Sequence, residues 1–551
     1  MGAAVACAPL GLGGPGKGED RMTDRRAWGG SMDRGIGSWV TKRAWNDGDR
    51  IALVEGDRSW SYDELDQRTD RLSQALLRLG LRRGDRVAML LYNSAALMET
   101  LFAAAKLGAI AVPINFRLSP PEVGYILADS GSDILVHHGG LADLARRAVA
   151  EEGVRVRHRL VDPGPIGAEG WTAELGELRY EDVLHDGSLR PVGMDVDPRD
   201  IHGIMYTSGT TGRPKGAMLT HANAIANATN NATHGRGLRQ GDVTVTAAPM
   251  FHIGGLGVHT LPLVFVGGTT VIHAAFLPDR FLATVSEVRA TVQFLFPAMW
   301  AAITRVEDFD RHDLSSLEMC LSGGAPTPPL VLGFFAERGL PFHEAFGMTE
   351  TAPAVSVLDT EDVRERAGSI GRPLPAVEAR LVDDHDREVP PGTVGELVLQ
   401  GDNVFAGYWM LPAATEEAFR GGWFHTGDLG RADEDGFITL VDRKKDMIIT
   451  GGESVYPVEV EQIIVRHPAV IEVAVFGIPD GLEGESVVAA VAVSEPVTAA
   501  DILTWSRERI AHFKAPKQIK LVDSLPRNAT GKVLKTHLRA AFGGAEASVL
   551  R

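Results

Sequence analysis

Cysteine is nearly absent from this 551-residue sequence, which contains only Cys7 and Cys320. Two cysteines cannot build a disulfide framework or a cysteine-based zinc site, so the composition favours a reducing compartment, the cytoplasm. Cys320 lies in an apolar run. We therefore expect a small buried side chain there rather than a nucleophile.

Positive charge is also scarce. The 55 Lys and Arg residues are outnumbered by 72 Asp and Glu residues, which gives a net charge of −17. Broad binding to nucleic acid or to an anionic membrane requires clustered cations, so the composition argues against both. A local basic pocket for a nucleotide remains compatible with this balance.

Residues 1–38 contain no long apolar run after a basic start, so they do not predict a signal peptide. We expect this tail to be disordered, and Met22 and Met32 are alternative start sites. Residues 243–278 contain no charged side chain, but their histidines, prolines and paired glycines are not typical of a membrane span. This stretch predicts a buried helix and strand, and no transmembrane segment is expected.

Apolar runs alternate with helical patterns from residue 51 to residue 296, which predicts an α/β fold of doubly wound, mostly parallel sheets. After residue 379 closely spaced short strands predict a small antiparallel β unit. A charge run at residues 442–446 precedes a fresh α+β pattern. We therefore expect a tail (1–38), a large domain (39–442) and a small, mobile C-terminal domain (443–551).

Residues 206–216, read YTSGTTGRPKG, concentrate glycine, hydroxyl and cationic side chains. Glycines let backbone N–H groups approach an anion, and hydroxyls and cations add donors, so the run predicts a polyphosphate loop. An apolar strand at 201–206 and a helix expected at 217–228 would supply the usual context. The run is not a Walker A loop. A plain surface turn is the alternative.

Six further segments occur downstream in a fixed order: PMFH (249–252), SGGAP (322–326), EAFGMTE (344–350), WFHTGD (423–428), DRKKD (442–446) with GGESVYPVEVE (451–461), and PRNATGK (526–532). Together with residues 206–216 they resemble the acyl-adenylate-forming superfamily, which includes acyl-CoA synthetases, adenylation domains of peptide synthetases and beetle luciferases. The resemblance covers about residues 51–538. It implies that a carboxylate attacks the α-phosphate of ATP, releasing pyrophosphate, and that a thiol then takes the acyl group.

The resemblance assigns most of the nucleotide site. Thr349 would bind the α-phosphate and Glu350 would bind Mg²⁺, although alone this pair indicates only a helix start. Phe346 departs from the tyrosine frequent in the family and keeps a stacking face for adenine without the hydroxyl. Asp428 and Arg443 would hold the ribose, with a simple turn as the alternative for Asp428. The remaining ATP-binding residues would be Thr207, Ser208, Gly209, Thr210, Thr211, Gly212 and Lys215 at the phosphates, and Gly323, Gly324, Ala325 and Gly347 near adenine.

The resemblance makes Lys532 the catalytic lysine that bridges the attacking carboxylate and the phosphate. Lys445 falls at the hinge position, where a domain rotation would exchange Lys532 for a CoA tunnel lined by Gly451 and Gly452. His252 would border the acyl pocket. A satisfied core histidine is the alternative for that residue.

We therefore predict an ATP-dependent, cytoplasmic acyl-CoA synthetase that takes a medium- or long-chain fatty acid, with ATP and CoA as substrates and Mg²⁺ as cofactor. An aryl-acid–CoA ligase and an acyl-AMP ligase that loads a carrier protein are the alternatives. No carrier-domain serine motif follows Lys532, which argues against a peptide-synthetase module. A non-catalytic sensor is disfavoured by the intact Lys532 and Glu350, and a homodimer is left open.

Overall fold

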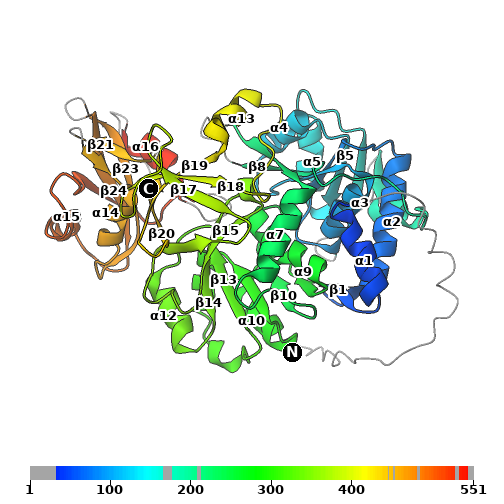
Figure 1. The fold of residues 1–551 in the computed structure, drawn as a ribbon, viewed down its shortest axis with the longest axis horizontal. Coiled ribbons are helices and arrows are strands. Elements are labelled where there is room, and N and C mark those ends of the chain that lie inside the picture. Colours follow the sequence, from blue (N-terminus) through cyan, green and yellow to red (C-terminus); the bar gives the residue numbers. More distant parts are fainter. Residues whose placement is uncertain are drawn as a thin grey trace.

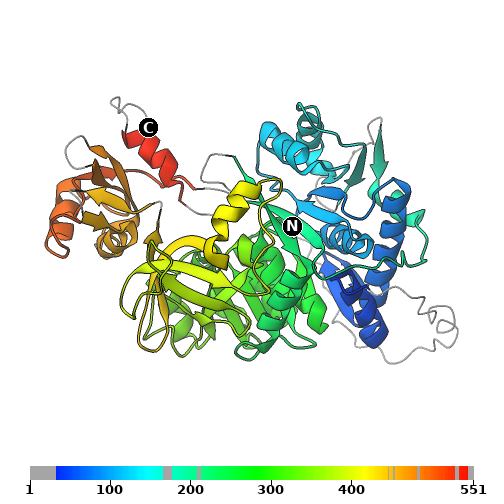
Figure 2. The same cartoon turned by 45° about the horizontal axis from the view of Figure 1, so that its top comes forward.

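The computed structural model describes residues 33–164, 176–207, 213–444, 446–450, 453–480, 484–527 and 533–543. Figure 1 shows the described chain as a broad α/β body with a smaller orange and red unit at one end, and Figure 2 shows the same separation after rotation. The α/β fold class predicted from the sequence is confirmed.

A seven-stranded sheet has the order β7-β6-β5-β3-β4-β8-β9 and is parallel except for the antiparallel pair β8–β9. Its strands are β3 (Arg86–Leu90), β4 (Ile110–Pro113), β5 (Ile134–His138), β6 (His158–Asp162), β7 (Glu177–Arg179), β8 (Ile201–Thr207) and β9 (Lys215–Thr220). The associated helices are α3 (Ala95–Leu107), α4 (Pro120–Ser130), η1 (Gly139–Leu141), α5 (Ala142–Val149), α6 (Tyr180–His185) and α7 (His221–Thr233). Every residue of α3 is buried, which places the core around this helix.

The chain enters this body through α1 (Gly37–Asp47), the predicted hairpin of β1 (Ile51–Glu55) and β2 (Arg58–Ser61), and α2 (Tyr62–Arg78). The predicted capping box is present, because Ser61 accepts from the backbone of Glu64 while the Glu64 carboxylate accepts from Ser61 N. Strands β10 (Val243–Thr246) and β11 (Thr269–Ile272) complete a four-stranded sheet of order β10-β11-β1-β2.

Residues 243–278 fold as β10, α8 (Ile253–Gly255), the π-helix η2 (Leu256–Thr260), α9 (Leu261–Val266) and β11, as the buried helix and strand interpretation predicted. Among the described residues, no helix is both long and apolar enough to cross a bilayer. Cys320 is fully buried, as expected.

A nine-stranded sheet has the order β12-β13-β14-β15-β16-β20-β19-β18-β17. Its parallel part is β12 (Val292–Leu295), β13 (Met319–Gly323) and β14 (Phe342–Gly347). The antiparallel part is β15 (Ala354–Leu358), β16 (Ser369–Pro373), β17 (Glu378–Val382), β18 (Gly395–Gln400), β19 (Phe424–Ala432) and β20 (Ile438–Arg443). The predicted antiparallel strands are thus present, and β15 joins the antiparallel part to the parallel part by pairing with β14.

Short helices connect the strands of this region: α10 (Pro278–Glu287), α11 (Pro297–Ile303), η3 (Phe309–Arg311), α12 (Pro329–Glu337), η4 (Thr349–Thr351), α13 (Pro412–Ala418) and η5 (Arg420–Gly422).

The C-terminal α+β unit contains a sheet of order β22-β21-β24-β23, with β25 paired to β24. Its elements are β21 (Ile448–Thr450), β22 (Glu453–Val455), α14 (Pro457–Ile464), β23 (Val470–Asp480), β24 (Gly484–Val493), α15 (Ala499–Arg507), β25 (Gln518–Leu521) and α16 (Lys535–Gly543). Val458 N donates to Asp442 Oδ2 at 3.1 Å, so a hydrogen bond links this unit to the end of β20.

Candidate active site

The predicted phosphate loop connects two antiparallel strands, β8 and β9. The start of the helix expected at residues 217–228 is wrong, because residues 215–220 pair with β8 and the helix, α7, begins only at His221. A capping box between Thr220 and Asn223 explains where the helix begins, because it fixes the N-terminus of α7 directly after the end of β9. Thr207 ends β8 and Lys215 begins β9. Residues 208–212, which carry the other predicted phosphate ligands, lie outside the described part of the chain.

Lys215 and Glu350 meet at Tyr408. The Tyr408 hydroxyl donates to Glu350 Oε1 at 3.1 Å, and Lys215 Nζ lies 5.0 Å from the centre of the tyrosine ring. Burial, followed by the charge of Glu350, raises the pKa of Tyr408, so the phenol stays protonated and remains a donor. The structure thus places the predicted phosphate lysine and the predicted Mg²⁺ carboxylate around one aromatic side chain.

The backbone of residues 405–409 holds this arrangement together. Met218 N donates to Gly407 O, and Trp409 N donates to Gly216 O, so the segment runs beside β9. Phe405 N donates to Glu350 O at 2.9 Å. One segment therefore fixes the position of the hairpin relative to η4, which carries Thr349 and Glu350.

The predicted adenine residues lie at the carboxyl ends of parallel strands. Gly323 ends β13 and Gly347 ends β14, while Phe296 follows β12, so all three share one edge of the sheet. Gly324 has φ +88°, and a Cβ at this position would lie 3.1 Å from the Phe296 ring. This backbone conformation and the close ring both favour glycine. Ala325 follows and is exposed, and Phe346 lies within β14.

His252 is the N-cap of α8, and its Nδ1 accepts from Gly254 N at 3.1 Å. Its ring packs edge-on against Phe296, with the ring centroids 5.2 Å apart. Burial lowers the pKa of His252 to about 4, so the ring is neutral near pH 7. The buried Asn93 holds the preceding turn, because its side chain donates to Ala248 O and accepts from Met250 N.

Asp428 is buried within β19, directly opposite Arg443 of β20. Asp428 N donates to Thr426 Oγ1, which in turn donates to Leu397 O, so the turn before Asp428 is anchored to β18. Only the backbone of Arg443 is described. The other expected residues, Lys445, Gly451, Gly452 and Lys532, lie outside the described residues.

Asparagines organise the site in a way that the sequence interpretation missed. Asn227 of α7 donates to Gly257 O in η2 at 2.7 Å and accepts from Ala354 N at 3.3 Å. Asn403 donates to Thr351 O and Ala354 O on either side of the turn after Glu350. The recurrence of asparagine at 223, 227, 230 and 231 is a helical spacing that could have indicated a polar helix face turned inward.

A family model described as AMP-binding enzyme matches residues 40–409, and one described as AMP-binding enzyme C-terminal domain matches residues 459–532. A feruloyl-CoA synthase of Amycolatopsis sp. is 41% identical over 93% of this chain and 100% of its own length. A long-chain-fatty-acid–CoA ligase of Escherichia coli is 35% identical over 89% of this chain and 91% of its own. The structure of an o-succinylbenzoate coenzyme A synthetase from Bacillus subtilis with ATP and magnesium ion matches with a TM-score of 0.80 at 31% identity, covering 91% of this chain and 99% of that chain.

Proposed function

Since the chain belongs to the AMP-binding enzyme family, in the acyl-CoA synthetase branch of the acyl-adenylate-forming superfamily, we propose that it joins an aryl carboxylic acid to CoA. Acyl- or aryl-CoA ligase activity with ATP and CoA as substrates follows from the family. The aryl nature of the acid substrate is the part that we propose. The fatty acid expected from the sequence remains the second candidate.

The aromatic wall beside His252 carries the preference for an aryl acid. Phe296 contacts both His252 and Phe294 through edge-on ring packing, which suits a flat aromatic substrate. A cavity that reaches Ile253, the residue after His252, and is lined also by Gly257 and Ala352 measures about 20 Å³, little more than the space for one water. A long alkyl chain could enter this cavity only if these residues moved. The relative described as a feruloyl-CoA synthase supports the same choice.

In the proposed first half-reaction, a carboxylate oxygen of the acid forms a bond to the α-phosphorus of ATP, and the bond from that phosphorus to pyrophosphate breaks. Lys215 and residues 207–212 would neutralise the leaving pyrophosphate, and Thr349 would donate to the α-phosphate. Lys532 would align the two reacting groups. In the second half-reaction the CoA thiol loses its proton to solvent, its sulfur bonds to the acyl carbon, the acyl–oxygen bond breaks, and AMP leaves.

Glu350 fits Mg²⁺ by its chemistry, because it is a half-buried carboxylate oriented by Tyr408 beside the predicted phosphate loop. Mg²⁺ is commonly held by one or two carboxylates together with substrate phosphates. When bound, the ion would offset negative charge on the phosphates.

A pyrophosphate-release assay over an acid panel tests the choice of substrate. We expect phenylpropenoic acids to give a higher kcat/KM than octanoate or palmitate. Phe296→Leu should lower kcat/KM for aryl acids by about 2- to 10-fold, the size of an aromatic pair, and affect alkyl acids less. Phe309→Leu, within a separate aromatic cluster, is the control. The fatty-acid alternative would be established if palmitate gave the highest kcat/KM and Phe296→Leu lowered kcat/KM equally for aryl and alkyl acids.

Lys532→Ala separates the half-reactions. Acid-dependent pyrophosphate exchange should fall by about 10²- to 10³-fold, the usual loss for one preorganised charge-stabilising group. Thioester formation from supplied acyl adenylate and CoA should persist. Exchange at the wild-type rate in this variant would contradict the role of Lys532, and Lys520→Ala in the same domain is the matched control.

A further inference from the structure

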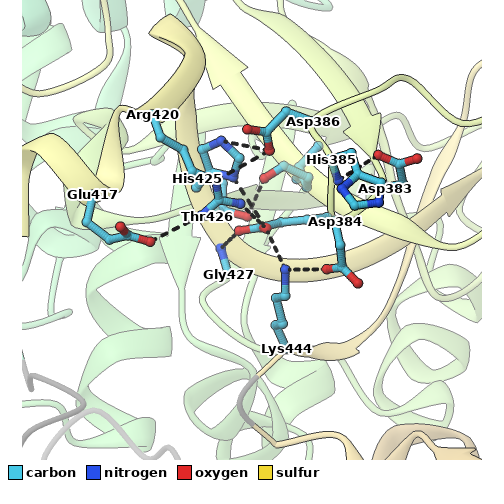
Figure 3. Close-up of polar contacts among 12 residues, drawn as sticks. Asp383, Asp384, His385, Asp386, Glu417, Arg420, His425, Thr426, Gly427 and Lys444 are labelled. Atoms are coloured by element: carbon cyan, nitrogen blue, oxygen red, sulfur yellow. Dashed lines mark hydrogen bonds and ion pairs between the residues drawn. The ribbon is translucent and has the colours of Figure 1, made fainter.

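Glu396 is a buried carboxylate in β18 surrounded by three basic side chains. Its Oε2 lies 3.2 Å from Arg420 Nη2, 3.3 Å from Lys444 Nζ and 3.3 Å from His425 Nδ1. Figure 3 shows Arg420, His425 and Lys444 approaching one another from separate segments near Gly427. We call Glu396, Arg420, His425 and Lys444 the Glu396 cluster.

Two further carboxylates contact the same basic side chains. Asp384 Oδ1 lies 2.9 Å from Lys444 Nζ, and Asp386 Oδ1 lies 3.4 Å from Arg420 Nε and 3.7 Å from His425 Nε2. Burial acts to raise the pKa of Glu396, but His425 and Lys444 outweigh it and lower the pKa, so the carboxylate remains ionised. A buried ion that loses its partners is strongly destabilising, so this geometry is tightly constrained.

The Glu396 cluster closes a ring of contacts around Gly427. Gly427 N donates to Glu396 Oε1 at 3.3 Å, Lys444 N donates to Gly427 O at 2.8 Å, and Lys444 Nζ returns to Glu396 Oε2. Gly427 has φ +72°, a conformation that suits glycine, and Asp428 follows it directly. Lys444 directly precedes residue 445, where the sequence predicts the hinge. The Glu396 carboxylate thus contacts both the turn before Asp428 and Lys444, the residue directly before the predicted hinge.

We infer that Glu396 is a positioning residue that fixes Asp428 for the ribose of ATP and ties this turn to Lys444 at the exit toward the C-terminal unit. The inference rests on the proposed role of Asp428 in nucleotide binding. Glu396 contacts neither substrate and acts through Gly427 and Lys444. Loss of its charge releases both the turn and Lys444, so the affinity for ATP falls while the proposed acid site at His252 and Phe296 is unchanged.

Steady-state pyrophosphate exchange with Glu396→Gln and Lys444→Met tests this inference. Glu396→Gln keeps an oxygen that can face Gly427 N but removes the charge that holds Lys444. We expect KM for ATP to rise about tenfold, equivalent to about 1.4 kcal/mol, with KM for the acid changed less than about twofold. Lys444→Met should raise KM for ATP in the same direction, and the double variant should match Glu396→Gln because both act through one contact.

Arg387→Met is the matched control, since Arg387 pairs with the exposed Asp383 in the same region and does not contact Glu396. Unchanged KM for ATP, equal increases in both KM values, or additive effects in the double variant would each overturn the inference. If Glu396→Gln does not fold, as judged by its melting curve, Lys444→Met alone decides, because Lys444 is about 41% exposed and tolerates substitution. A wild-type enzyme without exchange activity for any acid would instead contradict the proposed function.

Discussion

Tyr408 contacts both Lys215, through its ring, and Glu350, through its hydroxyl. A single substitution can remove the hydroxyl and keep the ring. Tyr408→Phe keeps the ring beneath Lys215 but deletes the 3.1 Å hydrogen bond to Glu350. A hydrogen bond to a charged group contributes about 1.5–3 kcal/mol, so we expect kcat/KM for ATP in pyrophosphate exchange to fall at least tenfold. Titration of Mg²⁺ should show a weaker apparent affinity, because the carboxylate is no longer oriented.

Tyr62→Phe provides the control for this substitution. Its hydroxyl donates to Gly268 O at 2.7 Å in the core, far along the chain from the proposed site. This variant should lower the melting temperature while kcat/KM stays at the wild-type value. Equal catalytic losses in both tyrosine variants would show that Tyr408 supports the fold rather than the reaction.

At this scale the sequence could indicate Thr349 and Glu350 because they lie within one contiguous motif. Tyr408 could not be found in that way. It follows Glu350 by 58 positions, and nothing in the local sequence shows that residues 405–409 run beside β9. Contacts made by long-range backbone pairing leave no periodic signal in the residues that make them.

At the scale of elements, α7 connects the π-helix beside His252 to the turn after Glu350. Asn227→Ala removes its contact with Asn231 Nδ2 within α7 and leaves Gly257 O and Ala354 N without this partner. Unsatisfied buried groups cost about 1–3 kcal/mol each, so we expect a lower melting temperature and a higher KM for both acid and ATP. Exchange kinetics and thermal denaturation measure these effects. Thr229→Ala, on the exposed face of α7, should change neither, and a full-activity Asn227→Ala enzyme would contradict this role.

Strand β9, which directly precedes α7, shows where sequence patterns mislead. Residues 215–220, KGAMLT, contain good helix formers, yet they form β9 because β8 offers an antiparallel partner. Tertiary pairing overrides a weak local propensity in this case. The hairpin of β1 and β2 was predicted correctly because its strands pair across a two-residue turn, where local sequence is sufficient.

At the scale of the molecule, alternating strands and helices predicted the layered fold, since each sheet must bury its faces against helices. The pattern could not show which strands of the several sheets are neighbours. β1 pairs with β11 and β16 pairs with β20, and both contacts join segments far apart in the sequence. Burial in this fold lowers the pKa of His202 and His259 to about 3 and that of His221, His252 and His273 to about 4, and it also lowers the pKa of His137 and His138.

These buried histidines make the whole fold sensitive to acid. An unfolded chain binds a proton on each histidine near pH 6.5, whereas the folded chain resists protonation until about pH 4 or below. The unfolded state therefore binds more protons across this window, and stability falls as the pH is lowered from about 6.5 toward 4. Asp33, whose pKa burial raises to about 6, acts in the opposite direction, as do Glu55, Asp162 and Glu344, whose pKa burial also raises, but these carboxyls are fewer than the buried histidines.

His202→Gln tests how much one buried histidine contributes to the pH dependence of stability. We expect the free energy of unfolding of this variant to depend less steeply on pH between about 6 and 4.5, by up to about 1.4 kcal/mol per pH unit, the value for one proton. Chemical denaturation at several pH values measures the slope. His185→Gln is the control, because that side chain is about 88% exposed and should leave the slope unchanged. A His202→Gln slope equal to that of wild type would mean that His202 gains its proton in the folded protein as readily as in the unfolded chain.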